Sequence, residues 1–72
     1  METMTKTEKF VEIRTAERLV AQYAHDKENG VDPESRVVAL ENWKSEKRNL
    51  YRLLDALPYE EMVEYGVWRR DH

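Results

Sequence analysis

The sequence predicts an all-α protein: an antiparallel pair of long helices followed by a short third helix. Apolar residues recur at three- and four-residue spacing over two long stretches, which is the period of an amphipathic helix. Helix-start residues precede these stretches, and glycine or proline follows them. A chain of 72 residues has room for a single domain, near the lower end of what one core can stabilise.

A first helix is expected over residues 6–28. Thr5 followed by Glu8 matches the capping box, in which the hydroxyl and the carboxylate each satisfy a backbone N–H group. Gly30 is expected to end this helix, because glycine accepts the left-handed conformation that closes a last turn. Residues 1–5 are predicted to be a frayed leader. The apolar face would consist of Phe10, Ile13, Ala16, Val20, Tyr23 and Ala24.

A second helix is expected over residues 33–57. Asp32 can cap its first turn, and Pro33 suits the first helical position, where no N–H group is needed. Pro58 ends it, because proline disrupts a helix interior. Its apolar stripe would contain Leu40, Trp43, Leu50, Leu54 and Leu57.

The connection between the two helices is short enough that they should fold back on each other as a hairpin. A third helix is expected over residues 59–65, ended by Gly66, with residues 66–72 as a tail. Near its end, the second helix is apolar over a wider arc than one neighbouring helix can cover. We therefore expect the third helix, through its face with Tyr59, Met62 and Val63, and Trp68 to fold onto that end.

In such a hairpin, facing residues have numbers that sum to about 62, from the rise of the helix alone. Lys47 falls within the stripe of the second helix and comes close to Glu17 across the pair. One hypothesis is a partly buried Glu17–Lys47 ion pair that fixes the register. The favoured alternative is that both side chains reach solvent from the edge of the seam.

More apolar residues are present than one seam between two helices needs. Exposed apolar clusters usually mark a partner surface. We expect a twofold homodimer in which two hairpins form a four-helix bundle, and the main alternative is a monomer capped by the third helix. The predicted interaction surface consists of Leu19, Val37, Val38, Leu53 and Trp68.

Composition excludes several classes of function. The chain has no cysteine, so it has neither disulfides nor thiol chemistry. The net charge of −3 excludes a generally basic nucleic-acid binder but not a local basic strip. No stretch is apolar enough to span a bilayer, and the N-terminus is too polar for a signal peptide. We expect a cytoplasmic protein without a membrane partner or a cofactor.

Two groups of residues have side chains that can bind metal ions. Glu60, Glu61 and Glu64 spell EExxE, which resembles the magnesium-binding half of the all-helical MazG-like nucleotide pyrophosphatases. That resemblance implies a magnesium-dependent nucleotide hydrolase, but it covers these three positions alone. The family's site also needs a second acidic motif further along the chain, and here only Asp71 follows. The favoured interpretation is an acidic first turn on a solvated helix.

The end of the first helix holds the other group, with His25 one turn before Glu28 and next to Asp26. A metal site there would need ligands from a partner chain, and a histidine near a helix C-terminus more often interacts with the helix dipole. No nucleophilic triad or glycine-rich phosphate loop is present. We therefore predict no metal site, no catalytic residue and no enzymatic activity.

Basic residues of the second helix suggest a possible nucleic-acid contact. Lys44, Arg48 and Arg52 are spaced by four and form a strip along one edge, which could track phosphates with help from Arg69 and Arg70. The favoured interpretation is a solvated face with intrahelical pairs.

In size and plan the chain resembles the Rop family of plasmid RNA-pairing proteins. The stretches 4–9 and 50–52 read similarly. That resemblance implies a dimeric hairpin that binds RNA through basic and aromatic residues on the outer face of its first helix. Here that face offers no aromatic residue and carries Glu12, Arg14, Arg18 and Gln22.

The sequence thus predicts a small non-enzymatic interaction or regulatory protein that presents a helical surface to an unidentified protein partner. The alternative is a nucleic-acid-binding accessory protein that uses the basic strip.

Overall fold

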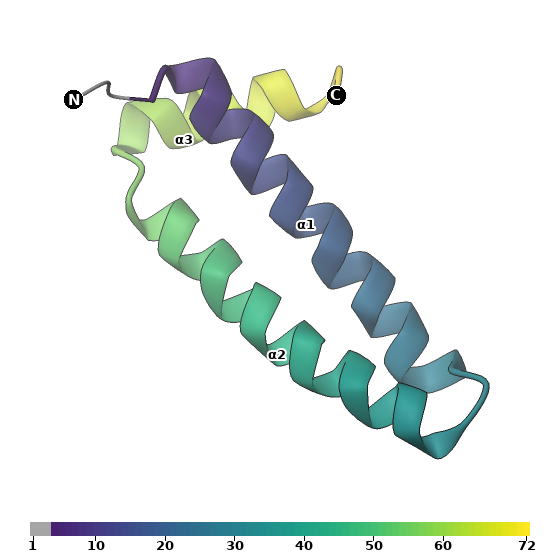
Figure 1. The fold of residues 1–72 in the computed structure, drawn as a ribbon. Coiled ribbons are helices and arrows are strands. Elements are labelled where there is room, and N and C mark those ends of the chain that lie inside the picture. Colours follow the sequence, from purple (N-terminus) through teal and green to yellow (C-terminus); the bar gives the residue numbers. More distant parts are fainter. Residues whose placement is uncertain (1–3) are drawn as a thin grey trace.

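A computed structural model describes residues 4–72, which form three helices and no strand (Figure 1). Helix α1 spans Lys6–Asn29, α2 spans Pro33–Asp55 and α3 spans Tyr59–Arg69. Helices α1 and α2 run antiparallel and pack together, joined by a tight turn (Figure 1). The predicted all-α fold and the helical hairpin are confirmed.

Side-chain caps begin both long helices, as predicted. The backbone N–H of Ser35 donates to Asp32 Oδ1 at 2.8 Å, and that of Glu8 donates to Thr5 Oγ1 at 3.1 Å. The Glu8 carboxylate accepts from the Thr5 hydroxyl rather than from the Thr5 backbone N–H, so the capping box is half formed. Of the predicted leader, residues 1–3 lie outside the described residues.

Gly30 follows α1, but the expected left-handed conformation is wrong. Its φ is −59° and its ψ is 147°, which is extended backbone open to any residue. The reason for glycine is the close approach of the chain in the turn. A Cβ atom at this position would lie 2.9 Å from the Asp26 carbonyl oxygen and 2.8 Å from Arg36 Cγ.

Helix ends also differ from the prediction on either side of Pro58. Helix α2 ends at Asp55, and Leu57 turns inward to become a buried residue. Helix α3 continues through Gly66 to Arg69, so the predicted end at residue 65 is wrong. A glycine lowers the stability of a helix interior but does not stop it when packing holds both sides, and here Tyr65 and Trp68 pack on either side of Gly66.

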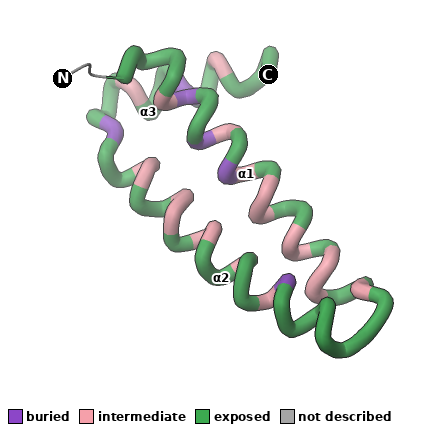
Figure 2. The backbone as a smooth tube through the Cα atoms, in the orientation of Figure 1, coloured by how far each residue is buried: buried purple, intermediate pink, exposed green. Residues whose placement is uncertain are grey.

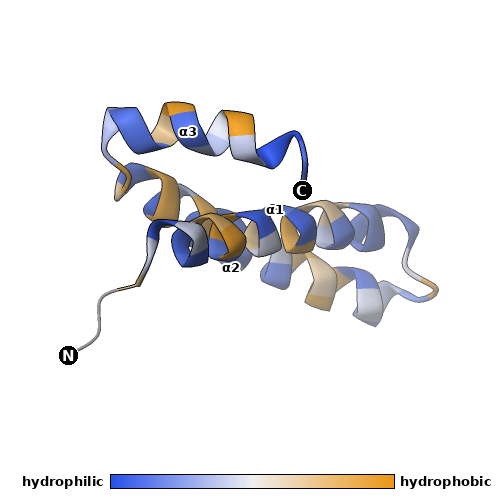
Figure 3. Ribbon diagram, turned by 90° about the horizontal axis from the view of Figure 1, so that it is seen from above, coloured by the Kyte–Doolittle hydropathy of each residue, from blue (hydrophilic) through white to orange (hydrophobic). Residues whose placement is uncertain are grey.

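The core lies where the three helices meet, at the end of the hairpin away from the turn (Figures 1 and 2). Phe10, Ile13, Leu57 and Tyr65 are buried there, and partly buried residues surround them: Leu50, Leu53, Leu54 and Trp68. Helix α3 crosses over the hairpin (Figure 3) and packs on α1. Tyr59, Met62 and Val63, which the sequence predicted to cover the end of α2, are exposed instead. Helix α3 packs through the opposite face, and the predicted packing of Trp68 is found, since it joins the core beside Leu53, Leu54 and Leu57.

The turn end of the hairpin has no comparable core. Ala39 is its one buried residue in the described chain, while Val31 is 99% exposed and Val37 and Val38 are each 59% exposed. The accessible surface is 5631 Å², whereas folded monomers of 8.7 kDa expose about 4,700 Å². Large apolar side chains remain exposed on all three helices, among them Val11, Val37 and Met62. Among the described helices, none combines the length and apolar content needed to cross a membrane.

Candidate interaction surfaces

Helix α3 is held by an aromatic contact on one face. The Phe10 ring lies 5.4 Å from the Tyr65 ring in an edge-to-face arrangement and 5.7 Å from the Trp68 ring. Such pairs stabilise a core beyond the area that they bury. Because Tyr65 and Trp68 are three residues apart, they lie on the same side of α3, and this side faces α1.

Charged groups on α1 hold the same face of α3. Lys9 Nζ lies 3.6 Å from Glu61 Oε1, and Lys6 pairs with Glu64. The hydrogen bond and the charge of Glu64 raise the pKa of the Lys6 ammonium group. These contacts span more than fifty residues of sequence and fix the position of the start of α3 over the start of α1.

Glu17 anchors the second half of α3. Its carboxylate accepts a hydrogen bond from the Tyr65 hydroxyl and lies 2.9 Å from Arg69 Nε. Lys47 is turned elsewhere, with its ammonium group 4.5 Å from the centre of the Trp43 ring. Within residues 4–72, Glu17 and Lys47 form no ion pair, and α3 supplies both partners of Glu17.

The outward side of α3 is apolar and exposed. Tyr59 is 80% exposed, Met62 45%, Val63 53% and Val67 59%. With Gly66 and Arg70 these residues follow helical spacing, so they form one stripe on the side opposite Tyr65 and Trp68. We call Tyr59, Met62, Val63, Gly66, Val67 and Arg70 the α3 outer stripe. Hydrophobic segments of α3 are visible above the hairpin in Figure 3.

Gly66 lies in the middle of this stripe. Among residues 4–72, no atom outside the local helix backbone lies within 4 Å of the position that a Cβ atom would take. Its φ is not positive either, so neither space nor backbone conformation in this described part of the chain requires glycine there. Glycine destabilises a helix interior by about 1 kcal/mol relative to alanine. The absence of a side chain leaves the backbone of α3 open to close approach from outside.

The predicted interaction residues do not form one surface. Leu53 and Trp68 pack against the core, and Leu19 is partly buried. Val37 and Val38 are exposed at the turn end, but they line two different hollows. The sequence did not predict the α3 outer stripe, because Tyr59, Met62 and Val63 were expected to pack on α2.

The predicted basic strip is exposed on α2. Lys44 and Arg48 accompany Trp43, Lys47 and Tyr51 around a shallow hollow of about 280 Å³. The two tail arginines do not extend the strip. Arg69 pairs with Glu17, and Arg70 is the residue that follows α3. Arg52, the third member of the strip, donates to Asn49 Oδ1 at 2.8 Å.

The acidic residues of the EExxE sequence do not form an open carboxylate cluster. Glu61 and Glu64 face lysines of α1, and Glu60 is exposed. His25 Nδ1 lies 3.5 Å from Asp26 Oδ1, and both side chains are exposed. Within residues 4–72, no group of three or more acidic or histidine side chains is arranged to hold a metal ion.

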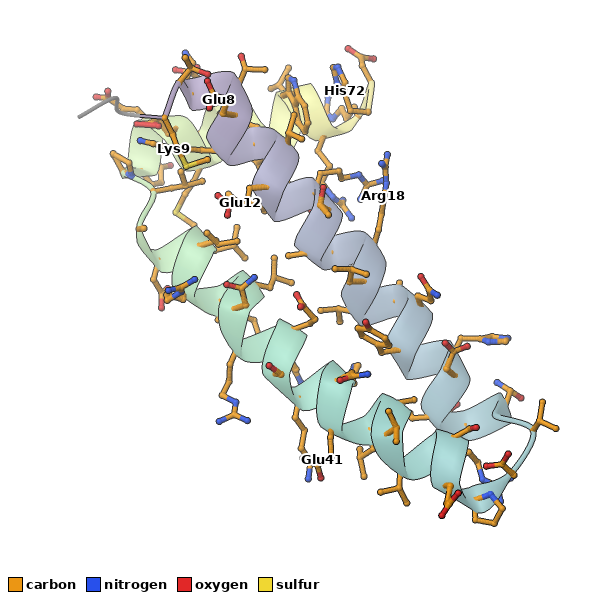
Figure 4. All side chains as sticks on the ribbon, in the orientation of Figure 1. Glu8, Lys9, Glu12, Arg18, Glu41 and His72 are labelled. Carbon is orange, nitrogen blue, oxygen red and sulfur yellow. The ribbon has the colours of Figure 1, made fainter. Side chains whose placement is uncertain are left out.

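His72 makes structural contacts that no pattern in the sequence predicted. Its ring stacks on Trp68 with 4.1 Å between ring centres and 8° between planes. The guanidinium group of Arg18 reaches the His72 carbonyl oxygen from α1 (Figure 4), and Arg14 Nε donates to the same oxygen at 3.4 Å. These contacts extend the seam between α1 and α3 past the end of the helix.

Comparison with protein-family models, with curated proteins and with solved structures gave no match. The function is therefore inferred from the residues of this chain alone.

Proposed function

We propose that this chain is a non-enzymatic helical interaction protein that pairs with a second copy of itself through the α3 outer stripe. The observation that carries the proposal is Gly66, a glycine at the centre of an exposed apolar helix face. It weakens the isolated helix, and no contact found among the described residues requires it. A second helix that packs closely against α3 would use the space that it leaves.

The stripe is complementary to itself in an antiparallel arrangement. When two copies of α3 are paired so that facing residue numbers sum to 129, every stripe residue meets another stripe residue. Val63 then faces Gly66, Met62 faces Val67 and Tyr59 faces Arg70. The largest apolar side chains thus meet smaller ones or a cation that can lie against a ring.

Charge favours the same arrangement. Glu60 and Arg70 are at opposite ends of α3, and within the described chain neither lies within ion-pair distance of an opposite charge. An antiparallel pair brings Glu60 of one copy toward the basic end of its partner. It also aligns the two helix dipoles in opposite directions, which is the favourable orientation.

This pairing differs from the bundle predicted along the hairpin. Leu53 and Trp68, two residues assigned to that interface, are used within the chain. A contact between two helices of 11 residues is small. Interfaces below about 1,200 Å² belong to the weak or transient class. We therefore expect a dimer that dissociates on dilution, which suits a regulatory protein that exchanges partners.

Sedimentation equilibrium of the full chain from micromolar to millimolar concentration tests the proposal. The wild-type mass should rise toward twice the monomer mass, and Val63→Glu should remain monomeric because it places a carboxylate at the centre of the contact. Val31→Glu is the matched control, since Val31 is 99% exposed in the turn, far from the stripe. A wild type that stays monomeric throughout, or equal loss of pairing in both variants, would refute the proposal.

A further inference from the structure

One edge of α2, next to its seam with α1, carries aromatic and cationic side chains side by side. Trp43, Lys47 and Tyr51 follow one another at four-residue steps, so they form a row along the helix. Lys44 and Arg48 form a parallel row next to it, and the five residues line the same hollow. We call these five residues the α2 aromatic–cationic surface.

Cation–π contacts fix this surface. Lys47 Nζ lies 4.5 Å from the centre of the Trp43 ring and 5.9 Å from that of Tyr51. Lys27 Nζ approaches the Trp43 ring from α1, at 5.0 Å. The Trp43 ring therefore holds two ammonium groups near each other, while the Tyr51 side chain remains 54% exposed.

The positive charge of this surface is not neutralised by carboxylates. Between Trp43 and Arg52 the sequence has four cations against one acid, Glu46. In the part of the chain that the structure describes, every ion pair lies within α1 or between α1 and α3, and none involves a residue of α2. A protein with a net charge of −3 thus keeps a local excess of positive charge beside an exposed ring.

We infer that the α2 aromatic–cationic surface binds single-stranded nucleic acid. The ammonium groups of Lys44 and Lys47 and the Arg48 guanidinium contact successive phosphates, and an unpaired base stacks on the Tyr51 ring. Surfaces for single-stranded nucleic acid combine these two elements, a cationic track and aromatic rings on which bases stack. Binding depends on base stacking and on charge, so little sequence preference is expected.

The exposed ring decides between this ligand and two others. A duplex keeps its bases stacked inside the helix, so it offers Tyr51 no base face and contributes phosphate contacts alone. An acidic protein segment would use Lys44, Lys47 and Arg48 but has no planar base for the ring. Single-stranded nucleic acid is the ligand that uses both the three cations of the surface and the exposed Tyr51 ring.

Fluorescence anisotropy with labelled dT20 and U20 strands and the full-length chain tests the inference. Replacing Tyr51 by Leu should weaken binding about tenfold, because stacking contributes about 1–3 kcal/mol per base. Tyr51→Phe keeps the ring and should bind like the wild type. Arg48→Gln should weaken binding, whereas Arg36→Gln removes the same charge from α2 outside the surface and should not.

Salt and competitors complete the test. With three phosphate contacts, raising salt from 50 to 200 mM should weaken binding about twentyfold, from a slope of about −0.7 per contact. Unlabelled duplex and polyglutamate should compete poorly. No binding at low salt, equal competition by polyglutamate or duplex, or equal losses for Arg48→Gln and Arg36→Gln would overturn the inference. The α3 outer stripe is left intact in all variants, so failure here does not bear on the dimer.

Discussion

The two ends of the hairpin differ in how they are stabilised. At the end covered by α3, Phe10 and Ile13 are 3% and 1% exposed and lie against residues of all three helices. At the turn end, α1 and α2 have only each other, and Val37 and Val38 remain more than half exposed. Two helices bury one seam, so the third helix is what converts a helical hairpin into a protein with a core.

Core truncation should separate the two ends most strongly. Ile13→Ala should lower the free energy of unfolding by about 2–5 kcal/mol, because it leaves a cavity in a packed site. This is comparable with the total stability expected of so small a domain, about 4–11 kcal/mol. Val38→Ala at the exposed turn end should change it by about 0.5 kcal/mol or less. Urea unfolding followed by circular dichroism gives both values, and equal losses would contradict the comparison.

The anchor of α3 on Glu17 should have the next largest effect. Tyr65→Phe removes a hydrogen bond to a carboxylate that is mostly buried, and it should destabilise the chain by about 1.5 kcal/mol. Hydrogen exchange should increase first in α3. Tyr51→Phe is the control, because that ring is exposed and no hydrogen bond of its hydroxyl is found among residues 4–72. Equal effects of the two changes would show that the Glu17 contact does not hold α3.

The two glycines offer a comparison with opposite signs. Gly66→Ala should raise the free energy of unfolding of the monomer by about 0.5–1 kcal/mol. Alanine has the higher helix propensity, and its Cβ atom would contact no other described residue. Gly30→Ala should lower it, because the new Cβ atom would lie 2.9 Å from a backbone carbonyl oxygen. Thermal unfolding at a low concentration, where the monomer predominates, measures both. A gain at Gly30 would contradict the close approach in the turn.

The ion pairs between α1 and α3 should contribute least. Lys9→Met should cost about 0.5 kcal/mol, because the pair with Glu61 is only partly shielded from water. The difference from the wild type should shrink in 1 M salt, which screens such charges. Arg36→Met at the turn end removes a cation that forms no ion pair in the described chain, so its effect should not depend on salt. If the destabilisation by Lys9→Met does not depend on salt, the Lys9–Glu61 ion pair does not contribute to stability.

Local signals in the sequence predicted the local structure well. Asp32, Pro33 and Thr5 act within three residues of their own positions, so the starts of both long helices could be predicted from them. Gly66 misled the prediction because a glycine in a sequence does not reveal whether packing continues on both sides of it. The register of α3 depends on Phe10 and Glu17, more than forty residues away.

The candidate surfaces also depend on packing that local sequence signals do not reveal. Tyr59, Met62 and Val63 form a more apolar face than Tyr65 and Trp68, so hydrophobicity alone selects the wrong side of α3 for burial. The four-residue spacing of Lys44, Arg48 and Arg52 predicted the basic strip. Its aromatic neighbours, Trp43 and Tyr51, were expected to belong to the apolar part of α2. Only the three-dimensional arrangement shows that Tyr51 is exposed beside Lys47.

Helix α3 packs on its own chain with one face, and in the proposed dimer it packs on a second copy with the other. Because the chain has no cysteine, oxidative cross-linking of an equimolar mixture of Val63→Cys and Gly66→Cys variants tests the paired register directly. Val63 faces Gly66 in the proposed pair, so mass spectrometry should find the mixed disulfide well above its statistical half of the cross-linked product. A statistical distribution, or cross-linking no faster than that of Val31→Cys, would contradict the account.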